Sequence, residues 1–173
     1  MLAYVFSHRP APGADVASYE EVLRAFHRAL AEMRPPGFVR SMTYRLGPAY
    51  ADWYLVENSA ALDPLNEAAV TGARQASHDA AARLATDGVG KLLNLAAGEF
   101  DPDALVETRF AKPRGMGYGA LYGALERWTH EPGTSLWRRM MVLGPPPEFT
   151  LVSSRPVELP AELNPETIFR TAV

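Results

Sequence analysis

His8 is the residue whose position best suits it to acid–base chemistry. It stands at the end of a predicted first strand over residues 2–7, in which Tyr4 and Phe6 share one face. A neutral imidazole there can take a proton from a phenol or an enol, which is the step that a cofactor-independent oxygenase requires. The alternative is a structural role, in which His8 caps the turn after the strand. We take His8 as the candidate catalytic residue.

The other three histidines are His27, His78 and His130. His27 directly follows Phe26 of a predicted apolar stripe, which predicts a place on the solvent side of the first helix. His130 falls in a predicted loop, and we expect a surface role for both. No two histidines have an HxH or HExxH spacing and the chain has no cysteine, so we predict no protein-built metal site.

Four aromatic residues and one histidine are our candidates for binding a ligand: Tyr4, Tyr44, Trp53, Trp137 and His78. Tyr44, Trp53 and Trp137 belong to a group of aromatic residues on two predicted β-hairpins. A packed core would use the same composition, so both interpretations stay open. If a pocket forms, its lining favours a small apolar or aromatic molecule.

A glycine-rich segment over residues 115–120 has the GxGxxA pattern of a dinucleotide-binding loop. A charged stretch separates it from the preceding strand, and Glu131 lies in a turn where a strand-end acid would be needed. Gly115, Gly119 and Gly123 recur every four residues, which favours close packing of one helix face. We therefore predict no nicotinamide cofactor, and no other cofactor.

A segment that occurs twice organises the elements that position these residues. Residues 40–58 contain Leu46-Gly47-Pro48 between two strand-like runs, and residues 138–154 contain Leu143-Gly144-Pro145 in the matching place. Each copy predicts a hairpin, and an amphipathic helix precedes each one. The first helix is predicted to begin with a capping box at Ser18 and to stop at Pro35-Pro36-Gly37.

The first half also contains two further predicted helices and a strand. Asp63 is predicted to cap a short helix that ends at Gly72, and a second helix is predicted over residues 73–86. A strand follows over residues 92–96. The second half restarts with a strand over residues 104–112, but it has no counterpart of the 73–86 helix.

The order of these elements predicts an α+β fold of two halves, over residues 1–100 and 101–173. The predicted order of strands and helices is βαββαβ in the first half and a shortened βαβββ in the second, with a last strand over residues 167–172. Each half is a ferredoxin-like βαββ-type unit, and the second lacks one helix.

This pattern resembles the dimeric α+β-barrel superfamily of ferredoxin-like domains, in the tandem arrangement of EthD-like and stress-responsive members. The resemblance implies that the two antiparallel sheets pair as a barrel, with His8 at its mouth. Haem-degrading members use a helix histidine as the iron ligand, a role that His78 would fill. They also use an asparagine on the first strand, and residues 2–7 contain none, which argues against haem.

Composition excludes several classes of partner. The chain has 17 basic and 20 acidic residues, a net charge of −3, which predicts binding to neither nucleic acid nor membrane. No leader pattern and no apolar run of roughly 20 residues is present, so we expect a cytoplasmic protein. Two function classes remain: a protein that binds a small apolar or aromatic molecule or has a non-catalytic role, and a cofactor-independent monooxygenase or isomerase.

The missing helix of the second half also bears on assembly. Without that helix, part of the apolar sheet face would be exposed to solvent. Symmetric dimers are the commonest way to cover an apolar patch. We therefore expect a homodimer whose interface uses residues 137–143 or the connector after Ser154.

Overall fold

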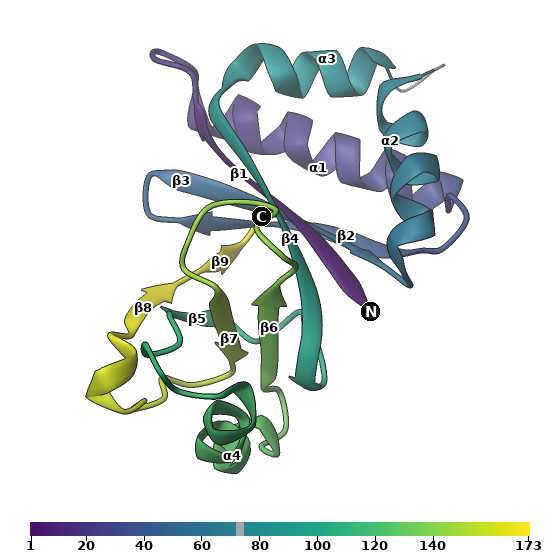
Figure 1. The fold of residues 1–173 in the computed structure, drawn as a ribbon. Coiled ribbons are helices and arrows are strands. Elements are labelled where there is room, and N and C mark those ends of the chain that lie inside the picture. Colours follow the sequence, from purple (N-terminus) through teal and green to yellow (C-terminus); the bar gives the residue numbers. More distant parts are fainter. Residues whose placement is uncertain (72–74) are drawn as a thin grey trace. The chain divides into compact units, whose positions relative to one another are not determined.

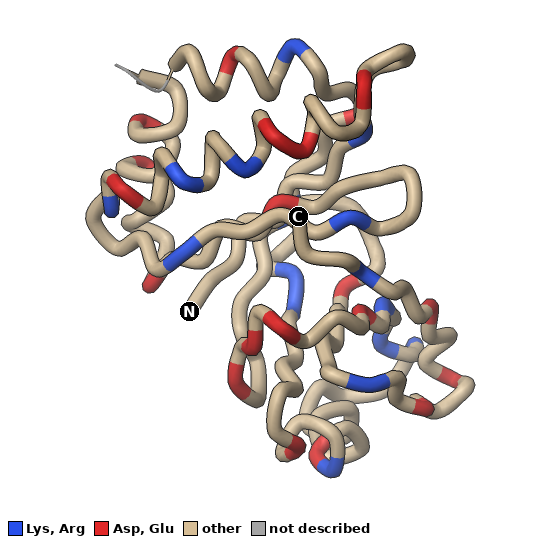
Figure 2. Tube along the Cα trace, turned by 180° about the vertical axis from the view of Figure 1, so that it is seen from behind, with Lys and Arg blue, Asp and Glu red and all other residues tan. Residues whose placement is uncertain are grey.

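The computed structural model describes residues 1–71 and 75–173, which form two compact units (Figure 1). The first unit contains Met1–Leu92 and Ala172–Val173, and the second contains Leu93–Thr171. The division falls inside strand β4 (Ala85–Gly98), a few residues before the expected boundary after residue 100. Acidic and basic residues are interspersed along the trace of both units (Figure 2). No helix within the described ranges is both long and apolar enough to cross a bilayer.

The first unit is a sheet with the strand order β4-β1-β3-β2 and three helices. Its elements are β1 (Leu2–Pro10), α1 (Val16–Met33), β2 (Phe38–Leu46), β3 (Ala49–Val56), α2 (Leu62–Val70), α3 (Gln75–Leu84) and the first part of β4. Strand β3 pairs antiparallel with both β1 and β2. The chain end lies along β2, where the backbone N–H of Val173 donates to the carbonyl of Thr43 at 3.1 Å.

Helix α1 forms where the apolar stripe predicts it, but it begins earlier. Its N-cap is Asp15, whose carboxylate accepts the backbone N–H of Ser18 at 2.9 Å. The predicted capping box at Ser18 is therefore wrong, because Ser18 lies inside the first turn. The helix ends at Met33, directly before the predicted Pro-Pro-Gly stop. Its buried residues are Tyr19, Leu23, Phe26, His27 and Leu30.

The start of α2 also differs from the prediction. The helix begins at Leu62, so Asp63 lies in its first turn and is not the N-cap. A short 3-10 turn, Ser59–Ala61, comes first and is capped by the side chain of Asn58. The predicted stop at Gly72 lies outside the described residues.

Helix α3 and strand β4 follow each other without a loop. Within the predicted helix over residues 73–86, positions 73 and 74 lie outside the described part and the helix ends at Leu84. Strand β4 is longer than the predicted 92–96. Asp87 has a φ of 55°, which bends the chain near the start of β4 without ending the strand.

The second unit repeats the strand order of the first. Its elements are β5 (Val106–Phe110), α4 (Tyr118–Thr129), β6 (Ser135–Arg139), β7 (Phe149–Ser153) and β8 (Glu166–Phe169), with the order β8-β5-β7-β6 and the last part of β4 beside β6. The two-residue strand β9 (Thr171–Ala172) follows. Both units thus place their strands in the order fourth, first, third, second. This confirms the predicted α+β class with two ferredoxin-like halves, of which the second lacks one helix.

The second hairpin is less regular than the sequence echo predicted. Strand β6 ends at Arg139 and β7 begins at Phe149, so Leu143-Gly144-Pro145 lies in a loop and does not form a tight turn. Met141 and Val142 in this loop are 75% and 81% exposed. The prediction that the two Leu-Gly-Pro segments occupy matching positions in their hairpins is therefore wrong, because the loop between β6 and β7 is much longer than the turn between β2 and β3.

Side chains from the connector complete the core of the second unit. Leu159 and Leu163, between β7 and β8, pack with the apolar residues of α4 and the sheet. They lie in the part of the chain that corresponds to the missing helix. Gly119 and Gly123 of α4 face open space, so the predicted close packing through these glycines is wrong. The apolar face of α4 is carried by Leu121, Leu125 and Trp128.

Leu163→Ala should destabilise the protein by about 2–4 kcal/mol, because it leaves a cavity where the connector closes the core. Leu163 is 2% exposed, whereas its neighbour Glu162 is exposed. Urea unfolding followed by circular dichroism measures the difference, and Glu162→Ala is the control, with an expected change within about 0.5 kcal/mol. Equal effects of the two substitutions would contradict this role of the connector.

Candidate active site

The helix-covered face of the first sheet carries polar side chains at its centre. Side chains alternate along a strand, so His8 of β1 lies on the same face as Phe6. The register pairs Phe6 with Asp52 and Thr43 with Asp52. The polar residues of β1 and β2 are therefore brought to one carboxylate in the middle of β3.

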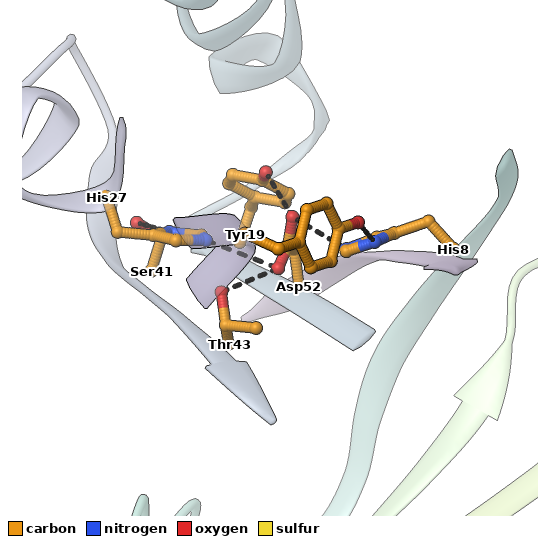
Figure 3. A network of polar contacts seen from close by, with 7 residues as sticks. His8, Tyr19, His27, Ser41, Thr43 and Asp52 are labelled. Carbon is orange, nitrogen blue, oxygen red and sulfur yellow. Dashed lines mark hydrogen bonds and ion pairs between the residues drawn. The ribbon is translucent and has the colours of Figure 1, made fainter. Parts of the chain in front are cut away.

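Asp52 is the centre of this network (Figure 3). It is 3% exposed. The hydroxyl of Thr43 donates to its Oδ1 at 2.6 Å, and that of Tyr54 donates to its Oδ2 at 3.2 Å. The Nε2 of His27 lies 3.3 Å from Oδ1, and the Nε2 of His8 lies 3.2 Å from Oδ2. Neither imidazole N–H points squarely at its oxygen, so these two contacts are close polar contacts rather than well-aligned hydrogen bonds.

Each imidazole has a second polar partner. The Nδ1 of His8 forms a short contact with the hydroxyl of Tyr19, and the Nδ1 of His27 lies 2.7 Å from the hydroxyl of Ser41. The result is a continuous chain of side chains from Tyr19 through His8, Asp52 and His27 to Ser41 (Figure 3). A carboxylate only accepts hydrogen bonds, so each imidazole carries a proton on the Nε2 that faces Asp52.

The surroundings of Asp52 favour its ionised form. Burial opposes ionisation, but the imidazoles of His27 and His8 outweigh it and hold the pKa of the Asp52 carboxyl below its ordinary value of 3.8. Burial, reinforced by the charge of Asp52, raises the pKa of the Tyr19 and Tyr54 hydroxyls. Near neutral pH the carboxylate is therefore charged, and both phenols keep their protons.

A cavity of about 510 Å³ in the first unit opens onto this network. His8, Tyr19, Asp52 and Tyr54 are part of its lining. Much of the remaining wall is apolar and comes from β1, α1, α2, α3 and β4; it includes Phe6, Leu23, Phe26, Leu65, Ala81 and Ala85. The volume lies in the range of small-molecule sites, which combine apolar walls with a few placed polar groups.

Gly88 of β4 fixes one part of this wall. A Cβ at this position would lie 2.6 Å from Cζ of Phe6, so only glycine lets the Phe6 ring pack against the strand. Because Phe6 lines the cavity, the close approach at Gly88 determines the shape of the cavity as well as the packing of the sheet.

Three of the predicted site residues lie together at this cavity. His8, Tyr4 and His78 all line it. The side chain of His78 is 39% exposed, and its Nδ1 lies 3.3 Å from the carboxylate of Asp79. Tyr4 stands beside Tyr54 with a ring separation of 6.0 Å. A catalytic role for His8 and a binding role for the other two stay predictions.

The other three predicted ligand-binding residues lie elsewhere. Tyr44 and Trp53 alternate with the polar residues of β2 and β3, so they point to the opposite face, and each is 1% exposed. Trp137 is buried in the second unit, where its indole N–H donates to Ser135 at 3.0 Å. A role in ligand binding for these three residues also stays a prediction.

The prediction for His27 is wrong. His27 is 8% exposed and faces the sheet. It follows Leu23 by four residues and precedes Leu30 by three, and residues at these spacings lie on one helix face. The apolar stripe of α1 is therefore wide enough to include the residue after Phe26.

Sequence reasoning also missed Asp52, Tyr19 and Thr43. A signal was present for Asp52, since it is the one charged residue in the strand AYADWYLV. A carboxylate in such a strand requires buried donors. The sequence does not say which donors these are, because they come from β1, β2 and α1 as well as from β3 itself.

A metal site is not found in the described ranges. No group of three or more His, Cys, Asp or Glu side chains among residues 1–71 and 75–173 is arranged to hold a metal ion. In the network itself, His8 and His27 contact different oxygens of Asp52.

Asp52→Asn should lower the free energy of unfolding by about 3 kcal/mol at pH 7, because it removes one partner of a buried charge network. The pKa of Asp52 in the folded protein lies below 3.8, so its contribution is present above this pH and is lost as the pH falls towards the folded value. The deficit of the variant should therefore shrink below about pH 4.

Urea unfolding of the two proteins between pH 3 and pH 7 tests this. The control is Asp103→Asn, which changes an exposed carboxylate and should stay within about 0.5 kcal/mol of the parent. A deficit of Asp52→Asn that is the same at both ends of the range would show that folding does not lower the pKa of Asp52.

Comparison with known proteins shows the fold alone. No family model and no curated protein sequence matches this chain. Among solved structures, the chain is similar to a Lactobacillus acidophilus protein whose name proposes a monooxygenase (TM-score 0.65, 10% identity, 99% of this chain and 93% of that one). It is also similar to an anthrone oxidase-like protein (TM-score 0.61, 9% identity, 99% and 91%). A third is a mutant form of SnoaB of Streptomyces nogalater, a cofactor-independent oxygenase (TM-score 0.44, 20% identity, 58% and 96%).

Proposed function

We propose that this protein is an enzyme that removes a proton from a small aromatic or enolic molecule, as the first step of a cofactor-independent oxygenation or isomerisation. The observation that carries the proposal is His8, which lies against an ionised carboxylate at the polar end of an apolar cavity. In this function His8 is the general base, and the apolar wall holds the ring system of the substrate.

The neighbours of His8 have the roles that a base requires. The Asp52 carboxylate lies 3.2 Å from Nε2, which favours a proton on that nitrogen and stabilises the positive charge that forms when the imidazole takes a second proton. Tyr19 contacts Nδ1, the nitrogen that is free to accept a proton. Tyr19 also lines the cavity, so its phenol can relay the proton. It gives its own proton to His8 and takes the proton of the substrate in exchange.

The anion formed in this step has two possible continuations. In an oxygenation, dioxygen is the oxidant: a ring CH₂ becomes C=O, one O₂ is consumed and one water is released. One oxygen atom enters the product, and the other leaves as water with both hydrogens. In an isomerisation no oxidant is needed, and the protonated His8 returns its proton to another atom of the substrate. The names of two proteins with a similar fold mention a monooxygenase and an anthrone oxidase, which supports testing the oxygenation first.

A non-catalytic binding protein is the second candidate. The size of the cavity and its mostly apolar wall favour this function as much as the first. Binding alone, however, does not require an imidazole and a carboxylate in the cavity wall. The two candidates differ in whether a bound enolisable molecule loses a proton.

Anthrone is a suitable probe, because its CH₂ group is acidic and its oxidation to anthraquinone is visible by absorbance. We expect the protein to accelerate anthraquinone formation above the protein-free rate in air, with one O₂ taken up per product. Without oxygen, in D₂O, it should accelerate deuterium exchange at the CH₂ group. His8→Gln should lower both rates by about 10²-fold, which is a typical contribution of a general base.

His130→Gln is the matched control, since it changes an exposed histidine of the second unit and should leave both rates unchanged. Deuterium exchange without oxidation would favour the isomerase function. Saturable binding of anthrone with neither reaction would favour the binding protein. Equal rates for His8→Gln and the parent would exclude His8 as the base.

A further inference from the structure

Asp52 has two imidazole partners but only one negative charge. Among the residues that the structure describes, the basic groups paired with its carboxylate are His8 and His27. Thr43 and Tyr54 are neutral donors. One imidazolium would compensate the buried carboxylate, whereas two would leave an excess positive charge in the core, which is strongly unfavourable. The two histidines therefore compete for the same carboxylate.

The partner of His8 favours its neutral form. Tyr19 is fully buried, and burial keeps its hydroxyl protonated, so this hydroxyl requires an acceptor. Within the described part of the chain, the hydroxyl contacts the Nδ1 of His8. That nitrogen must then carry a lone pair, which leaves His8 with one proton, on Nε2.

The partner of His27 suits the charged form. Its Nδ1 faces the hydroxyl oxygen of Ser41, which can accept a hydrogen bond from an Nδ1–H while its own O–H donates to water. Ser41 is half-buried, so its hydroxyl can reach solvent at this end of the network. An imidazolium at His27 thus has an acceptor for each of its two N–H groups.

We propose that His27 is a positioning residue that acts on His8 through Asp52: as the counter-ion of the carboxylate, it keeps His8 neutral and able to accept a proton. The catalytic part of this inference rests on the proposed function, but the protonation states do not depend on it. His27 is not part of the cavity lining, so it influences the base without touching a substrate.

Few other titratable groups face the two imidazoles. Around His27 these are Asp52 and Tyr54 of β3, whose ring stacks on His27 at 5.4 Å. Around His8 they are Asp52 and Tyr50 of β3 and Tyr19 of α1. His78 of α3 lines the same cavity. Asp52 is the one acid paired with either imidazole within the described ranges, so the charge of His27 should act on His8 through it.

The test is an NMR titration of the histidine side chains in the full-length protein, labelled with ¹³C and ¹⁵N at histidine. In His27→Gln, an amide N–H can still donate to Asp52 but carries no charge. We expect the titration midpoint of His8 to rise by about one pH unit, a tenfold change in its proton affinity, because protonation now neutralises the carboxylate.

Two further variants separate charge from hydrogen bonding. Thr43→Val removes a neutral donor from the same oxygen of Asp52, and it should shift the midpoint of His8 by less than about 0.3 units. His27→Leu removes both charge and donor, and it should raise the midpoint at least as far as His27→Gln. If His27→Leu does not fold, His27→Gln decides the outcome alone.

An unchanged His8 midpoint in folded His27→Gln would overturn the inference. So would a rise in Thr43→Val as large as that in His27→Gln, because the effect would then come from a lost hydrogen bond. With anthrone, the acid limb of the rate profile should move to higher pH by the same amount in His27→Gln. If the parent protein has no activity on anthrone, the proposed function fails for this probe, while the NMR titration still decides the role of His27.

Discussion

A single carboxylate enclosed within a sheet is the constraint on which the first unit depends. Asp52 lies in a strand whose other residues are apolar, and an uncompensated charge there would cost several kcal/mol. Its four partners come from β1, β2, β3 and α1. The Asp52 carboxylate has polar partners on all four elements. The position of α1 over the sheet is therefore fixed by polar contacts as well as by its apolar stripe.

The same constraint supplies the chemistry of the cavity. The apolar wall reduces the screening of charges, so the polar contacts around Asp52 are stronger than they would be in water. The network is also a polar part of the cavity lining. In the proposed function, His27 compensates the buried charge and His8 accepts the proton.

The two halves have the same strand order but differ in what packs against the sheet. In the first, side chains of α2 and α3 form part of the wall of a cavity. In the second, Leu159 and Leu163 of the connector occupy the core. Function depends on such sites and not on the fold, so the proposed function rests on the residues around Asp52.

The sequence by itself determined the local elements and their order. The apolar stripe of α1, its stop at Pro35, the hairpin around Gly47 and the restart after residue 100 follow from short-range patterns, and they were sufficient for the α+β class. The meeting of His8, His27 and Asp52 was decided only by the tertiary structure. Sheet register and the rotation of α1 bring these residues together, and both are set by packing between segments far apart in the chain. Local periodicity could suggest that His27 and Asp52 are buried, but not that they contact each other.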